Sequence, residues 1–120
     1  MVRFIRNLRY ACEGISFAVR TQAHMRIHAI AAILVCGTGA LLHLSRIEWA
    51  VLVLTIAIVI AAEMINTAVE QAVDRIGKEH HPLAKAAKDV AAGAVLVTAI
   101  MAIIVGLLIL GPPLWRLLGL

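Results

Sequence analysis

Three long apolar segments constrain the fold of this chain more strongly than any other feature of its sequence. They cover residues 27–44, 49–70 and 90–110, and the last of them ends at the Gly-Pro-Pro run of residues 111–113. An α-helix rises about 1.5 Å per residue, so about 20 residues cross a hydrocarbon layer of about 30 Å. No segment alternates between polar and apolar residues as membrane β-strands do. We therefore predict an all-α integral membrane protein with three transmembrane helices.

The composition supports a membrane location. Of the 120 residues, 62% are hydrophobic and 15% are charged, whereas a soluble domain has about 25% charged residues. A domain of this size has too much surface to hide so many apolar side chains from water, and a disordered chain would be far less hydrophobic. We expect residues 1–120 to form a single membrane-embedded domain.

The N-terminal residues 1–26 combine apolar side chains at helical spacing with five arginines. These arginines are Arg3, Arg6, Arg9, Arg20 and Arg26. Such a segment is too polar to span a bilayer and is typical of an amphipathic helix that lies in the membrane interface. We predict a surface helix over residues 1–26.

The distribution of positive charge predicts the orientation in the membrane. Nine basic residues lie before the first span or in the second connection, residues 71–88, and two lie elsewhere. Those of the second connection are Arg75, Lys78, Lys85 and Lys88. The two exceptions are Arg46 and Arg116. Because Lys and Arg concentrate in cytoplasmic loops, we expect the N-terminus and the second connection in the cytoplasm and the C-terminus outside.

Polar residues line one side of the second span near its predicted cytoplasmic end. Glu63, Asn66, Glu70 and Asp74 fall within about 80° of the helix circumference, and we call them the acidic stripe. Ionisable groups within a span are costly and by default indicate function. The structural alternative is a set of ion pairs with Arg75, Lys85 or Lys88 of the second connection.

The chemistry of the acidic stripe suits phosphate transfer. Carboxylate oxygens are ligands that Mg²⁺ prefers, often together with substrate phosphates. Glu63 lies deepest and is a candidate general base, and Glu70 lies two turns nearer the cytoplasm, where a metal–nucleotide complex could reach it. Lys88, at the start of the third span, could hold a phosphate or serve as an interfacial anchor. Its neighbour Asp89 could cap the helix or share the metal.

Other nucleotide and nucleic-acid sites have no support. The sequence contains neither GxxxxGK[ST] nor GxGxxG, so a P-loop or Rossmann nucleotide site is not indicated. Only five residues are aromatic, and a base-stacking surface needs more. We expect no nucleic-acid partner.

At these residues the sequence resembles the prokaryotic diacylglycerol kinase family. The most specific string is residues 63–70, Glu-Met-Ile-Asn-Thr-Ala-Val-Glu, followed by Asp74 and by Ala87-Lys88-Asp89. The run over residues 81–95 looks most like the undecaprenol kinases of Gram-positive bacteria. The Ile-Glu-Trp run at residues 47–49 also looks like this branch.

This resemblance implies a homotrimer in the bacterial plasma membrane, with active sites at the cytoplasmic interface that are shared between subunits. It implies that Glu63 takes the proton of the lipid hydroxyl and that Glu70 holds Mg²⁺ bridging the phosphates of ATP. Asn66 would lie near the reacting phosphate and the lipid, and Lys88 would contact the ATP phosphates.

The remaining matches to the family are less specific. Asp74 and Asp89 match polar positions of the nucleotide site, and Tyr10 and Gly14 match surface-helix positions that approach the nucleotide. One departure concerns the metal: Gln22 stands where the family usually has a second metal-binding glutamate. An amide oxygen can coordinate Mg²⁺ but brings no negative charge, so we expect weaker metal binding there.

The chemistry of the acidic stripe and the family resemblance both lead us to expect ATP- and Mg²⁺-dependent phosphorylation of a membrane lipid alcohol. Undecaprenol is the first candidate and diacylglycerol the second. The competing class is a small ion- or proton-conducting membrane subunit, which the deep carboxylate of Glu63 would support. A weakly active or inactive protein is the further alternative raised by Gln22.

Overall fold

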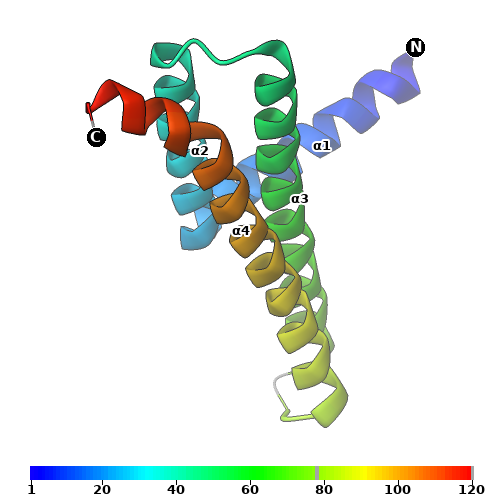
Figure 1. Cartoon of the computed structure of the whole chain (residues 1–120). Helices are drawn as coiled ribbons and strands as arrows, with labels where there is room; N and C mark the ends of the chain where they lie inside the picture. Colours follow the sequence, from blue (N-terminus) through cyan, green and yellow to red (C-terminus); the bar gives the residue numbers. More distant parts are fainter. Residues whose placement is uncertain (78, 120) are drawn as a thin grey trace.

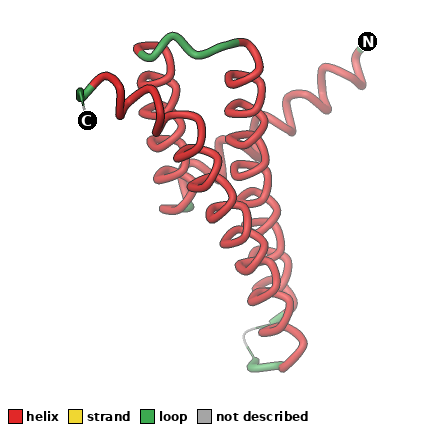
Figure 2. Tube along the Cα trace, viewed as in Figure 1, coloured by secondary structure: helices red, strands yellow, loops and turns green. Residues whose placement is uncertain are grey.

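A computed structural model describes residues 1–77 and 79–119, and the chain forms four helices there (Figure 1). Their bounds are α1 Val2–Thr21, α2 Ala23–Leu41, α3 Arg46–Ile76 and α4 Pro82–Leu117. Short connections join them, and no strand occurs in the described part of the chain (Figure 2). Lys78, which the charge analysis assigns to the second connection, lies outside the described residues. The all-helical prediction is confirmed.

Three of these helices, α2, α3 and α4, are long and apolar enough to cross a membrane. They extend beyond the predicted spans of residues 27–44, 49–70 and 90–110 at five of the six ends, and α2 stops three residues short at the other. One side of α4 packs against α3, but none of its residues is fully buried by the rest of the chain, and many of its apolar side chains are exposed. This arrangement is typical of a helix that is surrounded by lipid or by other helices rather than by water. The chain is an integral membrane protein.

The first helix is shorter than the predicted surface helix over residues 1–26. It ends at Thr21, because Gln22 has extended backbone angles (φ −106°, ψ 117°), and α2 begins directly afterwards. The last residues of the predicted surface helix therefore form the first turn of α2. In Figure 1, α1 runs obliquely behind α3 and leaves the bundle towards its N-terminus.

A side chain of α2 holds the corner between α1 and α2. The guanidinium of Arg26 donates through Nη1 to the carbonyl oxygens of Val19 (3.2 Å) and Arg20 (3.0 Å). The last carbonyls of a helix lack partners within the helix. Arg26 therefore occupies acceptors at the end of α1 and fixes the direction in which this helix leaves the bundle.

The connection between α2 and α3 contains a capping box that starts α3 earlier than predicted. The Ser45 hydroxyl accepts from the Glu48 backbone N–H (3.2 Å), and the Glu48 carboxylate accepts from the Ser45 N–H (2.7 Å). Nearby, the indole of Trp49 lies against Gly39, where a Cβ atom would be 3.2 Å from the ring. The two helices are thus closely packed at this end.

The helix α4 is longer than the third predicted span at both ends. Its first residue is Pro82, and the His81 imidazole accepts from the Leu83 N–H (3.1 Å). At the other end, the prediction that the Gly-Pro-Pro run ends the helix is wrong, because α4 continues through Pro112 and Pro113. Proline keeps a helical φ, but it removes an N–H donor and its ring crowds the carbonyl four residues earlier. The last turns deviate from the axis of α4 (Figure 1), as expected where prolines interrupt the hydrogen bonds.

The buried part of the molecule is small and follows one face of α3. Its buried residues are Leu52, Thr55, Val59, Glu63, Asn66 and Thr67. The face changes from apolar to polar along the helix. The buried polar residues lie where α1 and α2 meet α3, and this end of the face contains the candidate site.

Candidate active site

Glu63 is the most completely buried large side chain among the described residues, with 1% of its surface exposed. Its carboxylate oxygen Oε2 has no hydrogen-bond partner. Its backbone carbonyl is occupied, because the Thr67 hydroxyl donates to it (2.9 Å). An unsatisfied buried acceptor is costly, and a carboxylate even more so. Glu63 Oε2 is therefore an acceptor that a donor from outside the described residues can satisfy.

Asn66 lies one turn further along and connects to Glu70. The Asn66 side chain donates through Nδ2 to Glu70 Oε1 (3.3 Å), while its own Oδ1 is buried without a partner. Asn66 is 7% exposed, whereas Glu70 is only half-buried. The amide thus orients one carboxylate oxygen and leaves Glu70 accessible from the polar end of α3. Carboxylates in such positions suit hard cations.

Lys88 pairs with the acidic stripe, which is the structural alternative raised from the sequence. Its ammonium lies 2.6 Å from Asp74 Oδ1, joining α4 to α3. The neighbouring Asp89 pairs instead with Lys85 of its own helix. Consecutive residues of a helix point about 100° apart, and this separation explains why Asp89 and Lys88 contact different partners.

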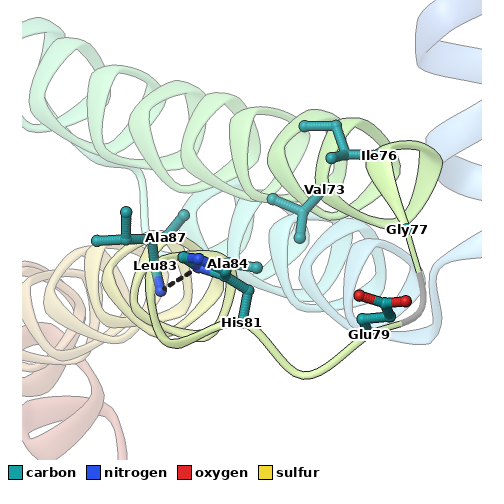
Figure 3. A pocket seen from close by; sticks show the side chains of 8 residues that line it. All are labelled: Val73, Ile76, Gly77, Glu79, His81, Leu83, Ala84 and Ala87. Carbon is teal, nitrogen blue, oxygen red and sulfur yellow. Dashed lines mark hydrogen bonds between the residues drawn. The ribbon is translucent and has the colours of Figure 1, made fainter.

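A cavity opens between the end of α3 and the start of α4 (Figure 3). It has a volume of about 770 Å³ and is lined by Val73 and Ile76 of α3 across from Leu83, Ala84 and Ala87 of α4. The connection contributes Gly77, Glu79 and His81. A more polar cavity of about 330 Å³ adjoins it, and its lining includes Asp74, Lys85 and Lys88. The acidic stripe therefore ends at an open, mostly apolar hollow with charged groups at one side.

Of the two α1 residues in the predicted site, Gly14 faces α3 and Tyr10 is exposed. Gly14 lines a hollow of about 220 Å³ between α1 and α3, together with Thr67 and Gln71. Tyr10 is 59% exposed. Gln22 is half-buried at the α1–α2 corner, where its amide donates to the Thr21 hydroxyl (3.4 Å).

Within residues 1–77 and 79–119, the carboxylates do not form a complete metal site. No group of three His, Cys, Asp or Glu side chains suitable for a metal occurs in the part of the chain that the structure describes. Gln22 and Glu70, the two predicted ligands, share no hydrogen bond there. Glu70 alone supplies a carboxylate, which suits Mg²⁺ when substrate phosphates complete its coordination.

Arg26 is the functional candidate that the sequence analysis did not single out beyond counting its charge. Its guanidinium contacts the end of α1, the helix that contains Gly14. A signal was present, since basic side chains near a helix C-terminus interact favourably with its free carbonyls. The signal was hidden because the predicted surface helix did not end before Arg26.

Comparisons with known proteins identify the family of this chain. The chain matches the family described as "Prokaryotic diacylglycerol kinase" over residues 9–110. It is 49% identical to the "Diacylglycerol kinase" of Synechocystis sp. over 113 residues, which are 93% of this chain and 65% of that protein. It is 47% identical to the "Undecaprenol kinase" of Bacillus subtilis over 112 residues, 93% of this chain and 91% of that protein.

A third relative is more distant. The "Diacylglycerol kinase" of Escherichia coli is 33% identical over 102 residues, which are 85% of this chain and 84% of that protein. The chain therefore spans slightly less than two thirds of the Synechocystis protein and most of the other two. The family match covers α2 and α3, most of α1 and α4, and every predicted site residue. The chain belongs to the prokaryotic diacylglycerol kinase family, a family of lipid kinases.

Proposed function

We propose that this protein transfers the γ-phosphate of ATP to the hydroxyl group of a membrane lipid alcohol, with undecaprenol as the substrate. The observation that supports this most directly is the carboxylate of Glu63, which is buried at the end of an apolar helix face with Oε2 unpaired. A lipid hydroxyl supplies the missing donor. Family membership favours a kinase over an ion-conducting subunit.

In this proposal, residues of the acidic stripe and Lys88 each have a separate role in phosphate transfer. Glu63 accepts the proton of the lipid hydroxyl at Oε2. Loss of this proton makes the lipid oxygen a better nucleophile towards the γ-phosphate. Asn66 orients Glu70 through its amide and lies near the reacting phosphate. Lys88 offsets the negative charge of the phosphates. Phosphoryl transfer depends mainly on positioning and charge neutralisation, so a few side chains at a helix end suffice.

Glu70 fits the Mg²⁺ that accompanies ATP. It is half-buried, so a cation can reach it, and its Oε1 is oriented by the amide of Asn66. Mg²⁺ bound there would neutralise phosphate charge. The amide oxygen of Gln22 is the proposed second ligand, and the hollow near Gly14 is the proposed approach of the nucleotide to α1.

The orientation and the assembly are also part of the proposal. The excess of Lys and Arg before α2 and between α3 and α4 supports a cytoplasmic location for both. ATP then reaches the acidic stripe from the cytoplasm, and the C-terminus lies outside. The resemblance to the family supports a homotrimer, and the outward-facing apolar surface of α4 is compatible with contacts between subunits.

Diacylglycerol is the second candidate substrate, because the Synechocystis and Bacillus relatives have different names and nearly equal identity to this chain. The test is a competition assay. Purified protein in detergent micelles receives Mg²⁺, labelled ATP and equal amounts of undecaprenol and diacylglycerol, and the labelled lipids are separated. We expect label mainly in undecaprenyl phosphate. Label mainly in phosphatidic acid would assign the second substrate, and label in neither lipid would contradict the proposed function.

A further inference from the structure

The ion pair between Asp74 and Lys88 differs from the other charge pairs of the molecule. Among the described residues it is the one ion pair that joins α3 to α4, and its partners are fourteen residues apart. The other two pairs, Arg9–Glu13 and Lys85–Asp89, each join residues of a single helix. The Asp74–Lys88 contact therefore depends on how α3 and α4 are packed against each other.

Stability does not account for this pair. The side chains of Asp74 and Lys88 are 62% and 38% exposed, and ion pairs this exposed contribute little to folding. Their position is more informative. Both residues line the polar cavity between α3 and α4, and Glu70, one turn before Asp74, also attracts the Lys88 ammonium. Lys88 is thus held over the end of the acidic stripe.

We propose that Asp74 is a positioning residue, which holds the Lys88 ammonium in place so that an incoming phosphate meets a cation already in position. The proposal rests on the proposed function, because it assigns Lys88 to the ATP phosphates. Lysine has a long, flexible side chain that loses considerable freedom when it is fixed. Asp74 provides this ordering before the nucleotide binds. With its charge offset by Lys88, Asp74 is a poor ligand for Mg²⁺ and does not contact the metal.

The test measures binding of MgATP to the purified full-length chain in detergent micelles, without lipid substrate. The variants are Asp74→Asn, Lys88→Gln and the double variant. We expect Asp74→Asn to raise the Kd for MgATP about tenfold, the order expected when a lysine side chain regains its freedom. The same substitution in the Lys88→Gln background has no further effect. Asp74→Glu, which keeps the carboxylate, retains most of the affinity.

Lys85 provides the matched control, since it lines the same cavity but pairs with Asp89 on its own helix. In a Lys85→Gln background, Asp74→Asn still raises the Kd about tenfold. An equal loss of affinity in the Lys88→Gln and wild-type backgrounds would overturn the proposal and make Asp74 a direct ligand. An unchanged Kd for Asp74→Asn would also overturn it.

The outcome is separable from that of the proposed function. A wild-type protein that binds MgATP with the expected Asp74–Lys88 coupling, yet phosphorylates no lipid, contradicts the proposed function and leaves the role of Asp74 intact. Lipid phosphorylation without this coupling supports the proposed function and contradicts the role of Asp74. A wild-type protein that binds no MgATP contradicts both.

Discussion

Gln22 stands at the corner between α1 and α2, at a position where the family resemblance places a metal-binding glutamate. Its amide contacts the hydroxyl of Thr21 and carries no charge that could offset Mg²⁺. We predict that Gln22→Glu lowers the Mg²⁺ concentration needed for half-maximal lipid phosphorylation about tenfold, because a carboxylate binds Mg²⁺ better than an amide does. A titration of Mg²⁺ at fixed ATP measures this.

The control for this prediction is Asn7→Asp, which adds the same charge at an exposed position of α1 that lines none of the cavities described above. We expect the control to leave the Mg²⁺ requirement unchanged. An equal effect of both substitutions would indicate general attraction of cations and not a ligand at position 22.

Among the glycines of α2, Gly39 is the one that packs closely against the start of α3 and the connection before it. A Cβ atom there would lie 2.9 Å from Leu44 Cδ1 and 3.2 Å from the Trp49 ring. The leucine tip can move, but the indole is rigid and half-buried. We predict that Gly39→Ala destabilises the protein by about 1–3 kcal/mol, the usual cost of overpacking. Thermal unfolding in detergent measures it.

Gly37 provides the comparison for Gly39 on the same helix, because a Cβ atom there meets nothing within 4 Å. Alanine is the better helix former, so Gly37→Ala is expected to be neutral or slightly stabilising. Equal unfolding temperatures for the two variants would contradict the account of this contact.

The site residues differ in how far the sequence could predict their surroundings. The spacing of Glu63, Asn66 and Glu70 places them on one face of a helix, and the structure has Asn66 bonded to Glu70 as neighbours one turn apart. The sequence could not predict which ion-pair partners Lys88 and Asp89 have. The partner of Lys88 depends on the register of α4 against α3, which the packing of the two helices sets.

At the scale of elements, the bounds of the helices depend on local chemistry that hydropathy does not detect. The capping box of Ser45 and Glu48 starts α3 before the apolar run begins. The extended backbone of Gln22 separates α1 from α2 within a segment that looks continuous in its periodicity. The prolines at residues 112 and 113 suggest a helix end, yet α4 tolerates them, because neighbouring groups in membrane proteins can satisfy the freed carbonyls.

The direction of α1 is set by one side chain of α2. Arg26 donates to the carbonyls of Val19 and Arg20, and we predict that Arg26→Gln loosens α1 without unfolding α3. The expected result is about tenfold faster amide hydrogen exchange near the end of α1, as loss of a hydrogen bond from a charged group implies. Exchange measured by mass spectrometry in micelles reports this for each helix separately.

Arg20→Gln is the matched control for Arg26→Gln, because it removes the same charge from the corner while leaving the contacts of Arg26 in place. Exchange in α1 should then change little. If both variants accelerated exchange equally, the net charge of α1 and not the Arg26 contact would hold this helix.

At the scale of the whole molecule, the composition and the position of the charges explain the architecture. The three spans follow from apolar length alone, and α4 packs against α3 without any of its residues becoming fully buried. The few charged residues within the bundle gather at one end of α3 and α4, around the cavities there. The proposed mechanism needs no soluble catalytic domain, because in it the helix ends themselves supply a carboxylate base, a carboxylate for a cation and a lysine.

The measurement that tests the central claim most directly is phosphate transfer from labelled ATP to undecaprenol by wild-type protein and by Glu63→Gln. Glu48→Gln is the control, since it makes the same change at the opposite end of α3, where glutamine still completes a capping box. We predict that wild-type and Glu48→Gln protein phosphorylate the lipid. Glu63→Gln remains folded and loses activity by about 10²–10⁴-fold, the usual contribution of a general base. Near-normal turnover by folded Glu63→Gln protein would contradict the account.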